Sequence, residues 1–208
     1  MNTDSAVKAL PAEVDTPAKR LRWWSELEPQ WRAAFQYAFF MHGNQPTVDE
    51  LANLWQTTVL RFAGPKAPYP NMTFELTNGS GLRGMVNLEI LVLTNHQLKD
   101  VDELADLKNL KSLFINENSI RNLEGIKRLT RLEQLYAHAN QIESIEPLQD
   151  LIRLREIYVN LNALKTLAGI TRKHSKALKA FFCLPNDKLP DREIIRVERN
   201  LGIRCQSL

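Results

Sequence analysis

The side chains that could bind a metal or act as nucleophiles are few in this 208-residue chain, and they stand far apart. The histidines are His42, His96, His138 and His174, and no two of them have the short spacing of metal ligands. The acidic run DVDELAD lacks the glycine and the oxygen-ligand spacing of a calcium loop. No phosphate-binding glycine loop and no nucleophile elbow occurs. The sequence therefore predicts no catalytic, metal or cofactor site, and we expect a protein that is not an enzyme.

Two cysteines, Cys183 and Cys205, stand 22 residues apart. Equivalent positions on adjacent strands lie ~4.8 Å apart, which is close enough for a disulfide. The N-terminus lacks the basic start and apolar stretch of a signal peptide, and no apolar run approaches the ~18 residues of a membrane span. We therefore predict a cytoplasmic protein without membrane contact, in which the reducing environment keeps both thiols free.

The charge balance also limits the kinds of partner. The formal net charge is +3, which is too mild to indicate nucleic acid by itself. A basic cluster, TRKHSKALK, places Arg172, Lys173, Lys176 and Lys179 around His174. At this density we expect a solvated loop, and nucleic acid is not the favoured partner. A monomer is the expectation, although nothing in the sequence fixes the oligomeric state.

An internal sequence repeat is the dominant pattern of the chain. Several columns of apolar residues recur with a period of 22 residues. The first three columns are Leu88, Leu110, Leu132, Leu154; then Leu91, Leu113, Leu135, Ile157; then Leu93, Ile115, Ala137, Val159. A polar column follows, made of His96, Asn118, Asn140 and Asn162. Alternating residues of a strand point to opposite faces, so each unit predicts a short strand with a buried apolar face and an asparagine turn. Because His96 replaces asparagine, the first full coil is expected to turn somewhat differently.

The motif LxxLxLxxNxL resembles the leucine-rich repeat family, in the short class of the internalins and phosphatase regulators. The resemblance covers roughly residues 60 to 205. It implies an α/β fold, a right-handed solenoid with a parallel concave sheet, a helical N-terminal cap and a helix–strand C-terminal cap. The resemblance does not specify a function, because this repeat is a scaffold that is reused for many partners. We expect a non-enzymatic scaffold or regulator that binds a protein or peptide.

The ends of the array predict the domain organisation. We divide the chain into a mobile tail over 1–16, a helical cap over 17–58, the repeats over 59–190 and a C-terminal cap over 191–208. Two capping boxes are predicted in the first cap, Ser25 with Glu28 and Thr47 with Glu50. In the last cap Asp191 is the predicted N-cap, and a final strand at LGIRC is expected to align Cys205 with Cys183.

An aromatic column supplies the candidate binding site. Position five of each unit, counted from its first leucine, points away from the core. It holds Val92, Phe114, Tyr136, Tyr158 and Phe182. Position seven points the same way and adds Asn116, His138 and Asn160. Aromatic rings with polar neighbours are typical of recognition surfaces, so we expect a protein or peptide to bind here on the concave face. Two alternatives stay open: the aromatics reflect only strand propensity and the real contact lies at an edge or a cap, or the protein belongs to an RNA-processing assembly.

Overall fold

The structure is a computed structural model that describes residues 15–207. The predicted mobile tail lies outside the described residues, apart from Asp15 and Thr16. None of the helices within residues 15–207 is long and apolar enough to cross a bilayer.

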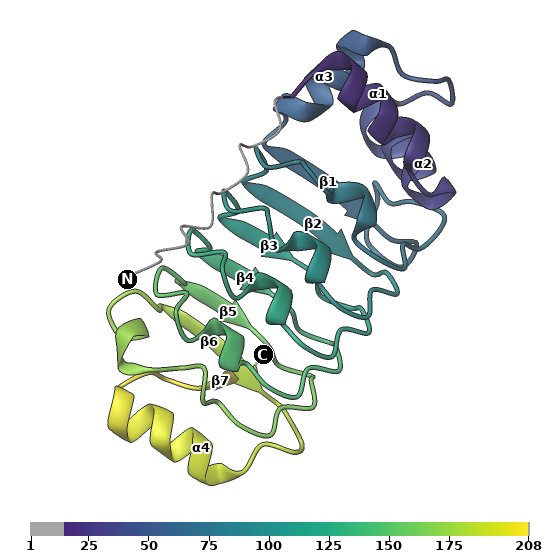
Figure 1. The fold of residues 1–208 in the computed structure, drawn as a ribbon. Helices are drawn as coiled ribbons and strands as arrows, with labels where there is room; N and C mark the ends of the chain where they lie inside the picture. The colour runs from purple at the N-terminus through teal and green to yellow at the C-terminus, as the bar shows by residue number, and fades with distance from the viewer. Residues whose placement is uncertain (1–14, 208) are drawn as a thin grey trace, which may run out of the picture.

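In the described part of the chain, seven parallel strands form one open sheet in chain order (Figure 1). They are β1 (Val59–Ala63), β2 (Ile90–Thr94), β3 (Ser112–Phe114), β4 (Gln134–Tyr136), β5 (Glu156–Tyr158), β6 (Ala180–Leu184) and β7 (Gln206–Ser207). Leu91 pairs with Leu113, Leu113 with Leu135, and Leu135 with Ile157, so the register follows the 22-residue period. This topology confirms the predicted solenoid.

Short 3₁₀ helices form the opposite wall of the solenoid. They are η2 (Ser80–Leu82), η3 (Asp102–Leu104), η4 (Glu124–Ile126), η5 (Glu146–Leu148) and η6 (Arg172–His174). The inward leucines of the strands and the apolar residues of these turns meet between the two walls. Leu113, Leu135 and Ile157 are all 0% exposed, because each coil is covered by the coils before and after it.

The asparagine column forms a hydrogen-bonded ladder along the turns. The Asn140 Oδ1 accepts from the Ile120 amide at 3.0 Å, and Nδ2 donates to the carbonyl oxygens of Ile115 at 3.0 Å and Ala137 at 3.2 Å. Asn118, Asn162 and Asn186 make equivalent contacts. Each side chain therefore joins two coils and satisfies backbone groups that the turn leaves unpaired.

His96 makes the two contacts to the preceding coil that these asparagines make. Its Nδ1 accepts from the Leu76 amide at 3.1 Å, and its Nε2 faces the Phe62 carbonyl oxygen at 3.2 Å. Since Nδ1 accepts, the proton is on Nε2, and the neutral ring offers one acceptor and one donor as an amide does. The expectation that the first coil turns differently was wrong, because imidazole can replace the amide in the ladder.

Replacing Asn140 by alanine is expected to destabilise the array by roughly 1–3 kcal/mol, because the buried backbone groups that it bonds lose their partner. Urea unfolding followed by circular dichroism measures the change. Asn53→Ala on the exposed face of a cap helix is the matched control. Equal midpoints for the two variants would mean that the ladder contributes nothing to stability.

Three α-helices and a π-helical turn cover the first strand (Figure 1). They are α1 (Pro17–Glu26), α2 (Pro29–Phe35), the turn η1 (Gln36–Phe40) and α3 (Val48–Gln56). The Thr47–Glu50 capping box is confirmed. The Ser25–Glu28 box is wrong: Ser25 lies inside α1 and its hydroxyl donates to the Arg22 carbonyl. Pro29 disfavours helical geometry at Glu28 and is itself the first residue of α2, so a new helix begins there.

The C-terminal cap consists of α4 (Asp191–Ile195), which continues as the π-helical segment η7 (Arg196–Asn200). The N-cap position is Pro190 and not Asp191, and it makes no side-chain cap bond. Phe182 pairs with Gln206, so β7 starts after Cys205, and the expected alignment of Cys205 with Cys183 was wrong. The paired residues are 24 positions apart at Phe182 and 23 apart at Leu184, with a register irregularity between the two pairs, so β7 does not follow the 22-residue period. Both cysteines are buried and free.

Candidate functional site

Four aromatic rings at position five stack along the sheet, and we call them the aromatic stripe: Phe114, Tyr136, Tyr158 and Phe182. The centroids of successive rings lie 4.7, 4.3 and 4.5 Å apart, and the ring planes deviate by 23°, 11° and 13°. Consecutive strands hold the rings at this spacing because a parallel sheet repeats every ~4.8 Å. The register predicted from the sequence therefore brings these four residues together.

Stacking determines which part of each ring can meet a partner. The rings of the stripe are half-buried rather than fully exposed, because each ring covers the faces of its neighbours. Their edges form a ridge along the sheet. Ring edges carry the positive end of the aromatic quadrupole and favour contact with carbonyl oxygens or other ring faces. The stack also stabilises the sheet, so the stripe has a structural role beside any recognition role.

The residues beside the stripe are polar, and several bond to one another. The Tyr136 hydroxyl donates to the Glu156 carboxylate at 2.5 Å, and the Ser112 hydroxyl donates to Gln134 at 2.7 Å. Burial and then the contact with Glu156 raise the pKa of Tyr136 above its ordinary value. Tyr136 therefore stays a neutral hydrogen-bonding group and is not a base.

The remaining predicted site residues differ in accessibility. Val92, Asn116 and His138 are half-buried on the same face as the stripe. Burial lowers the pKa of His138, and its buried Nδ1 has no hydrogen-bond partner within residues 15–207. Asn160 is 1% exposed, so its predicted role as a contact residue was wrong.

The burial of Asn160 follows from the irregular last coil. The Leu161 amide donates to the Pro185 carbonyl at 2.7 Å, which brings this coil close to the end of β5. In the next strand, β6, Leu184 occupies position seven. Among the described residues, the side-chain amide of Asn160 has no hydrogen-bond partner on either its nitrogen or its oxygen.

Charged side chains lie mainly at the margin of this face or on other surfaces. Lys111 pairs with Glu89 at 2.7 Å, and Arg155 pairs with Glu133 at 3.3 Å. The basic cluster does not form a site around His174. That histidine is 0% exposed, and its Nε2 bonds the Leu148 carbonyl at 3.2 Å.

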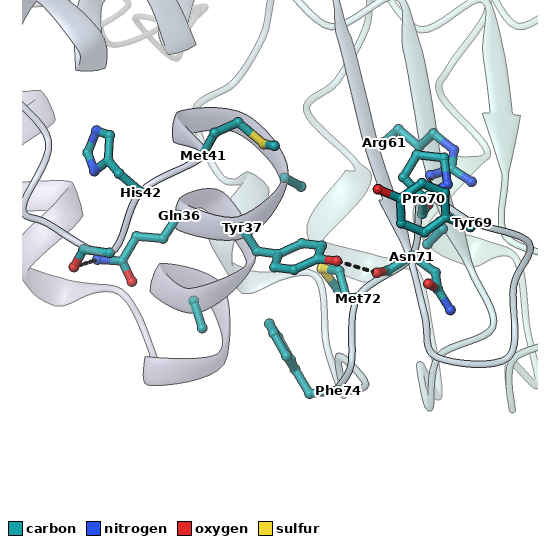
Figure 2. A pocket seen from close by; sticks show the side chains of 14 residues that line it. Gln36, Tyr37, Met41, His42, Arg61, Tyr69, Pro70, Asn71, Met72 and Phe74 are labelled. Carbon is teal, nitrogen blue, oxygen red and sulfur yellow. Dashed lines mark hydrogen bonds between the residues drawn. The ribbon is translucent and has the colours of Figure 1, made fainter.

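A groove at the N-terminal end of the sheet was not predicted. It has a volume of about 700 Å³ and lies between the first strand, the helical cap and the loop that follows β1 (Figure 2). Arg61 and Ala63 line it from β1, Tyr37 lines it from the cap, and Tyr69 and Phe74 line it from the loop. The Tyr37 hydroxyl donates to the Asn71 carbonyl at 2.7 Å and links the cap to the loop.

The residue that could have indicated this groove is Arg61, through its position in the strand pairing of β1. Arg61 pairs with Val92, and Val92 pairs with Phe114, so Arg61 occupies position five of the first strand. The 22-residue period does not reach Arg61, because an irregular segment with several prolines separates β1 from the next unit. Within residues 15–207 no group of three or more His, Cys, Asp or Glu side chains is arranged to hold a metal ion.

Comparisons with known proteins agree with the fold. Residues 108–150 match the family model described as Leucine Rich repeats (2 copies). An internalin C2 from Listeria monocytogenes str. 4b F2365 is 27% identical, with a TM-score of 0.53 over 68% of this chain and 57% of the internalin chain. An internalin F from the same strain is 21% identical, with a TM-score of 0.43 over 71% of this chain and 53% of its own.

The chain therefore spans little more than half the length of these two internalin structures. No curated protein matches it by sequence. The 22-residue units, the ladder at their turns, the family model matched over residues 108–150 and the parallel fold shared with internalin C2 together show that this chain folds as a leucine-rich-repeat solenoid.

Proposed function

We propose that this protein is a non-enzymatic scaffold or regulator that binds a protein or peptide on the sheet face that carries the aromatic stripe. The observation that carries the proposal is the stack of four rings on the outward face of consecutive strands. Soluble sheets usually present polar side chains to water, and a contiguous aromatic surface is typical of interaction sites.

The polar groups around the stripe support a protein or peptide partner. Asn116 and His138 lie on the same face, next to Phe114 and Tyr136, and can exchange hydrogen bonds with a backbone. Each ring can bury a large area while losing few rotamers, which is why aromatic residues dominate binding hot spots.

Nucleic acid is the less favoured partner. Among the outward positions three, five and seven of β1 to β6, Arg61 is the one lysine or arginine. A face with so few cations gains little from releasing the counterions of phosphates. We therefore expect no salt-dependent binding of RNA to this face.

Binding is tested best with a substitution that leaves the ring stack intact. Asn116→Arg places a bulky charged side chain beside the stripe without removing a ring. A displayed library of random twelve-residue peptides selected on the wild-type protein is expected to yield ligands that bind this variant at least thirtyfold more weakly, about 2 kcal/mol. Isothermal titration calorimetry measures the affinities.

Gln149→Arg is the matched control, since it adds the same side chain to an exposed position after η5, on the opposite wall. It is expected to bind the selected peptides as the wild type does. Ligands that bind the Asn116→Arg variant with unchanged affinity, or no enrichment of any peptide, would rule out a site on the stripe.

A further inference from the structure

Arg61 belongs to two surfaces at once. Its pairing with Val92 makes it the first member of the column that continues into the aromatic stripe. It also lines the groove beside the N-terminal cap (Figure 2). The stripe and the groove are therefore joined through Val92 and Arg61 on one face of the sheet.

The guanidinium of Arg61 is oriented but not neutralised. It donates to the carbonyl oxygens of Pro68, at 3.4 Å, and Pro70, which tie it to the loop. No aspartate or glutamate within residues 15–207 forms an ion pair with it, and its side chain is exposed. A guanidinium has five N–H donors, so donors remain for an anion, and a carboxylate matches their planar arrangement.

The rest of the groove is mainly apolar. Three of its large side chains are unusually exposed: Tyr37 at 43%, Met41 at 79% and Tyr69 at 87%. Contiguous exposed apolar residues of this size are typical of ligand sites rather than of a solvated surface. On the cap side, His42 also contributes to the lining, and its buried Nδ1 has no hydrogen-bond partner within the described residues.

The helical cap limits how far a ligand on the sheet can extend. The turn η1 stands beside the outward residues Arg61 and Ala63 of β1, and residues of both segments line the same groove. Figure 1 shows the cap helices at the β1 end of the solenoid, where the row of strands ends. A chain that runs along the stripe toward β1 must end at this wall or turn away from the sheet.

We infer that the groove binds the free C-terminus of a peptide, with the terminal carboxylate on Arg61 and a bulky apolar last side chain between Tyr37 and Tyr69. This inference rests on the proposed function and specifies its partner. The preceding residues lie across the strands on the aromatic stripe. From β1 to β6 there are five strand spacings of ~4.8 Å, about 24 Å in all, which corresponds to about seven extended residues.

The probe for the groove alone is N-acetyl-L-phenylalanine, which carries an apolar side chain and a carboxylate. Its neutral counterpart is N-acetyl-L-phenylalaninamide. Titrations followed by amide chemical shifts of the full chain are expected to show millimolar binding of the acid, as is usual for a fragment of this size. The shifts are expected at Gly43, Ala63 and Asn71, and the amide is expected to bind at least fivefold more weakly.

Three variants distinguish the contribution of the Arg61 charge to binding from the contribution of apolar contacts. Arg61→Gln is expected to remove the preference for the acid, whereas Arg61→Lys retains part of it because the charge remains. Tyr69→Ala is expected to weaken both probes equally, since it removes apolar contact and leaves Arg61 in place. Because Arg61 and Tyr69 are exposed, these changes are expected to leave the fold intact, which the unperturbed amide spectrum of the remaining coils checks.

The outcomes distinguish this inference from the function on which it rests. Equal affinities of acid and amide, or an acid preference that survives Arg61→Gln, would overturn the inference about the C-terminus. In that case the selected peptides can still lose affinity through Asn116→Arg, and the stripe remains the site. Conversely, acid binding in the groove together with peptides insensitive to Asn116→Arg would retain the carboxylate site and reject the stripe.

Discussion

Replacing Trp31 by alanine is expected to lower the free energy of unfolding by about 3–5 kcal/mol. Trp31 is 0% exposed, and its ring packs at 5.6 Å from Phe35 and at 5.3 Å from Phe62 of the first strand. Its Nε1 donates to Asn78 at 3.2 Å, so the substitution also leaves a polar group without this partner. A Cβ atom on Gly81 would lie 2.3 Å from the indole, which shows how closely the first coil surrounds it.

The reason for so large an effect is the position of Trp31 at the end of an array. The first coil has no preceding coil to cover its apolar side, so α2 must cover it. Chemical denaturation monitored by circular dichroism measures the loss. Met41→Ala, at a side chain that is 79% exposed, is the control and is expected to change stability little. A wild-type midpoint for Trp31→Ala would mean that α2 does not stabilise the solenoid.

Acidification is expected to destabilise the protein before its carboxylates titrate. Burial is the main cause that lowers the pKa of His96 from 6.5 to about 4, against the opposing effects of the Phe62 carbonyl and the Glu75 carboxylate. The unfolded chain takes up this proton as the pH falls through 6.5, while the folded protein does so only near 4. The folded state therefore binds fewer protons in this window, and its stability falls as the pH falls.

The expected loss from His96 is about 3 kcal/mol between pH 6.5 and 4, at 1.36 kcal/mol for each pH unit of pKa difference. Burial also lowers the pKa of His138 and His174, so these residues act in the same direction. His96→Asn isolates one contribution, because asparagine occupies this position in the later coils and does not titrate. Urea unfolding at pH 7.5 and pH 5 is expected to show a loss about 2 kcal/mol smaller for this variant than for the wild type. Parallel losses would show that His96 does not couple folding to protons.

The architecture could be predicted because every coil of a solenoid repeats the same local structure. The leucine and asparagine columns specify the inward face and the turn of every coil, and stacking then determines the sheet. For the same reason the register of Phe114, Tyr136 and Tyr158 was correct: a residue between two buried positions of a strand must point outward. A repeat pattern therefore carries more three-dimensional information than an ordinary sequence of this length.

The features that could not be predicted depend on contacts between different kinds of segment. Asn160 follows the pattern of its column, but the irregular coil around Pro185 buries it. The groove at Arg61 requires η1 and the proline-rich loop to meet over β1, and neither segment has a periodic signal. His96 interrupts the asparagine column in the sequence, yet it makes the equivalent hydrogen bonds, because imidazole and amide side chains each offer one donor group and one acceptor group.

Binding of a partner along the aromatic stripe is tested most directly by a chemical-shift map of the wild-type protein with its tightest selected peptide. We expect the perturbed amides to follow β3 to β6, at Phe114, Tyr136, Tyr158 and Phe182, and to continue to Arg61. The 3₁₀ turns on the opposite wall, from Asp102–Leu104 to Arg172–His174, are expected to stay unperturbed. Perturbations confined to that wall or to the C-terminal cap would show that the partner does not bind on the stripe.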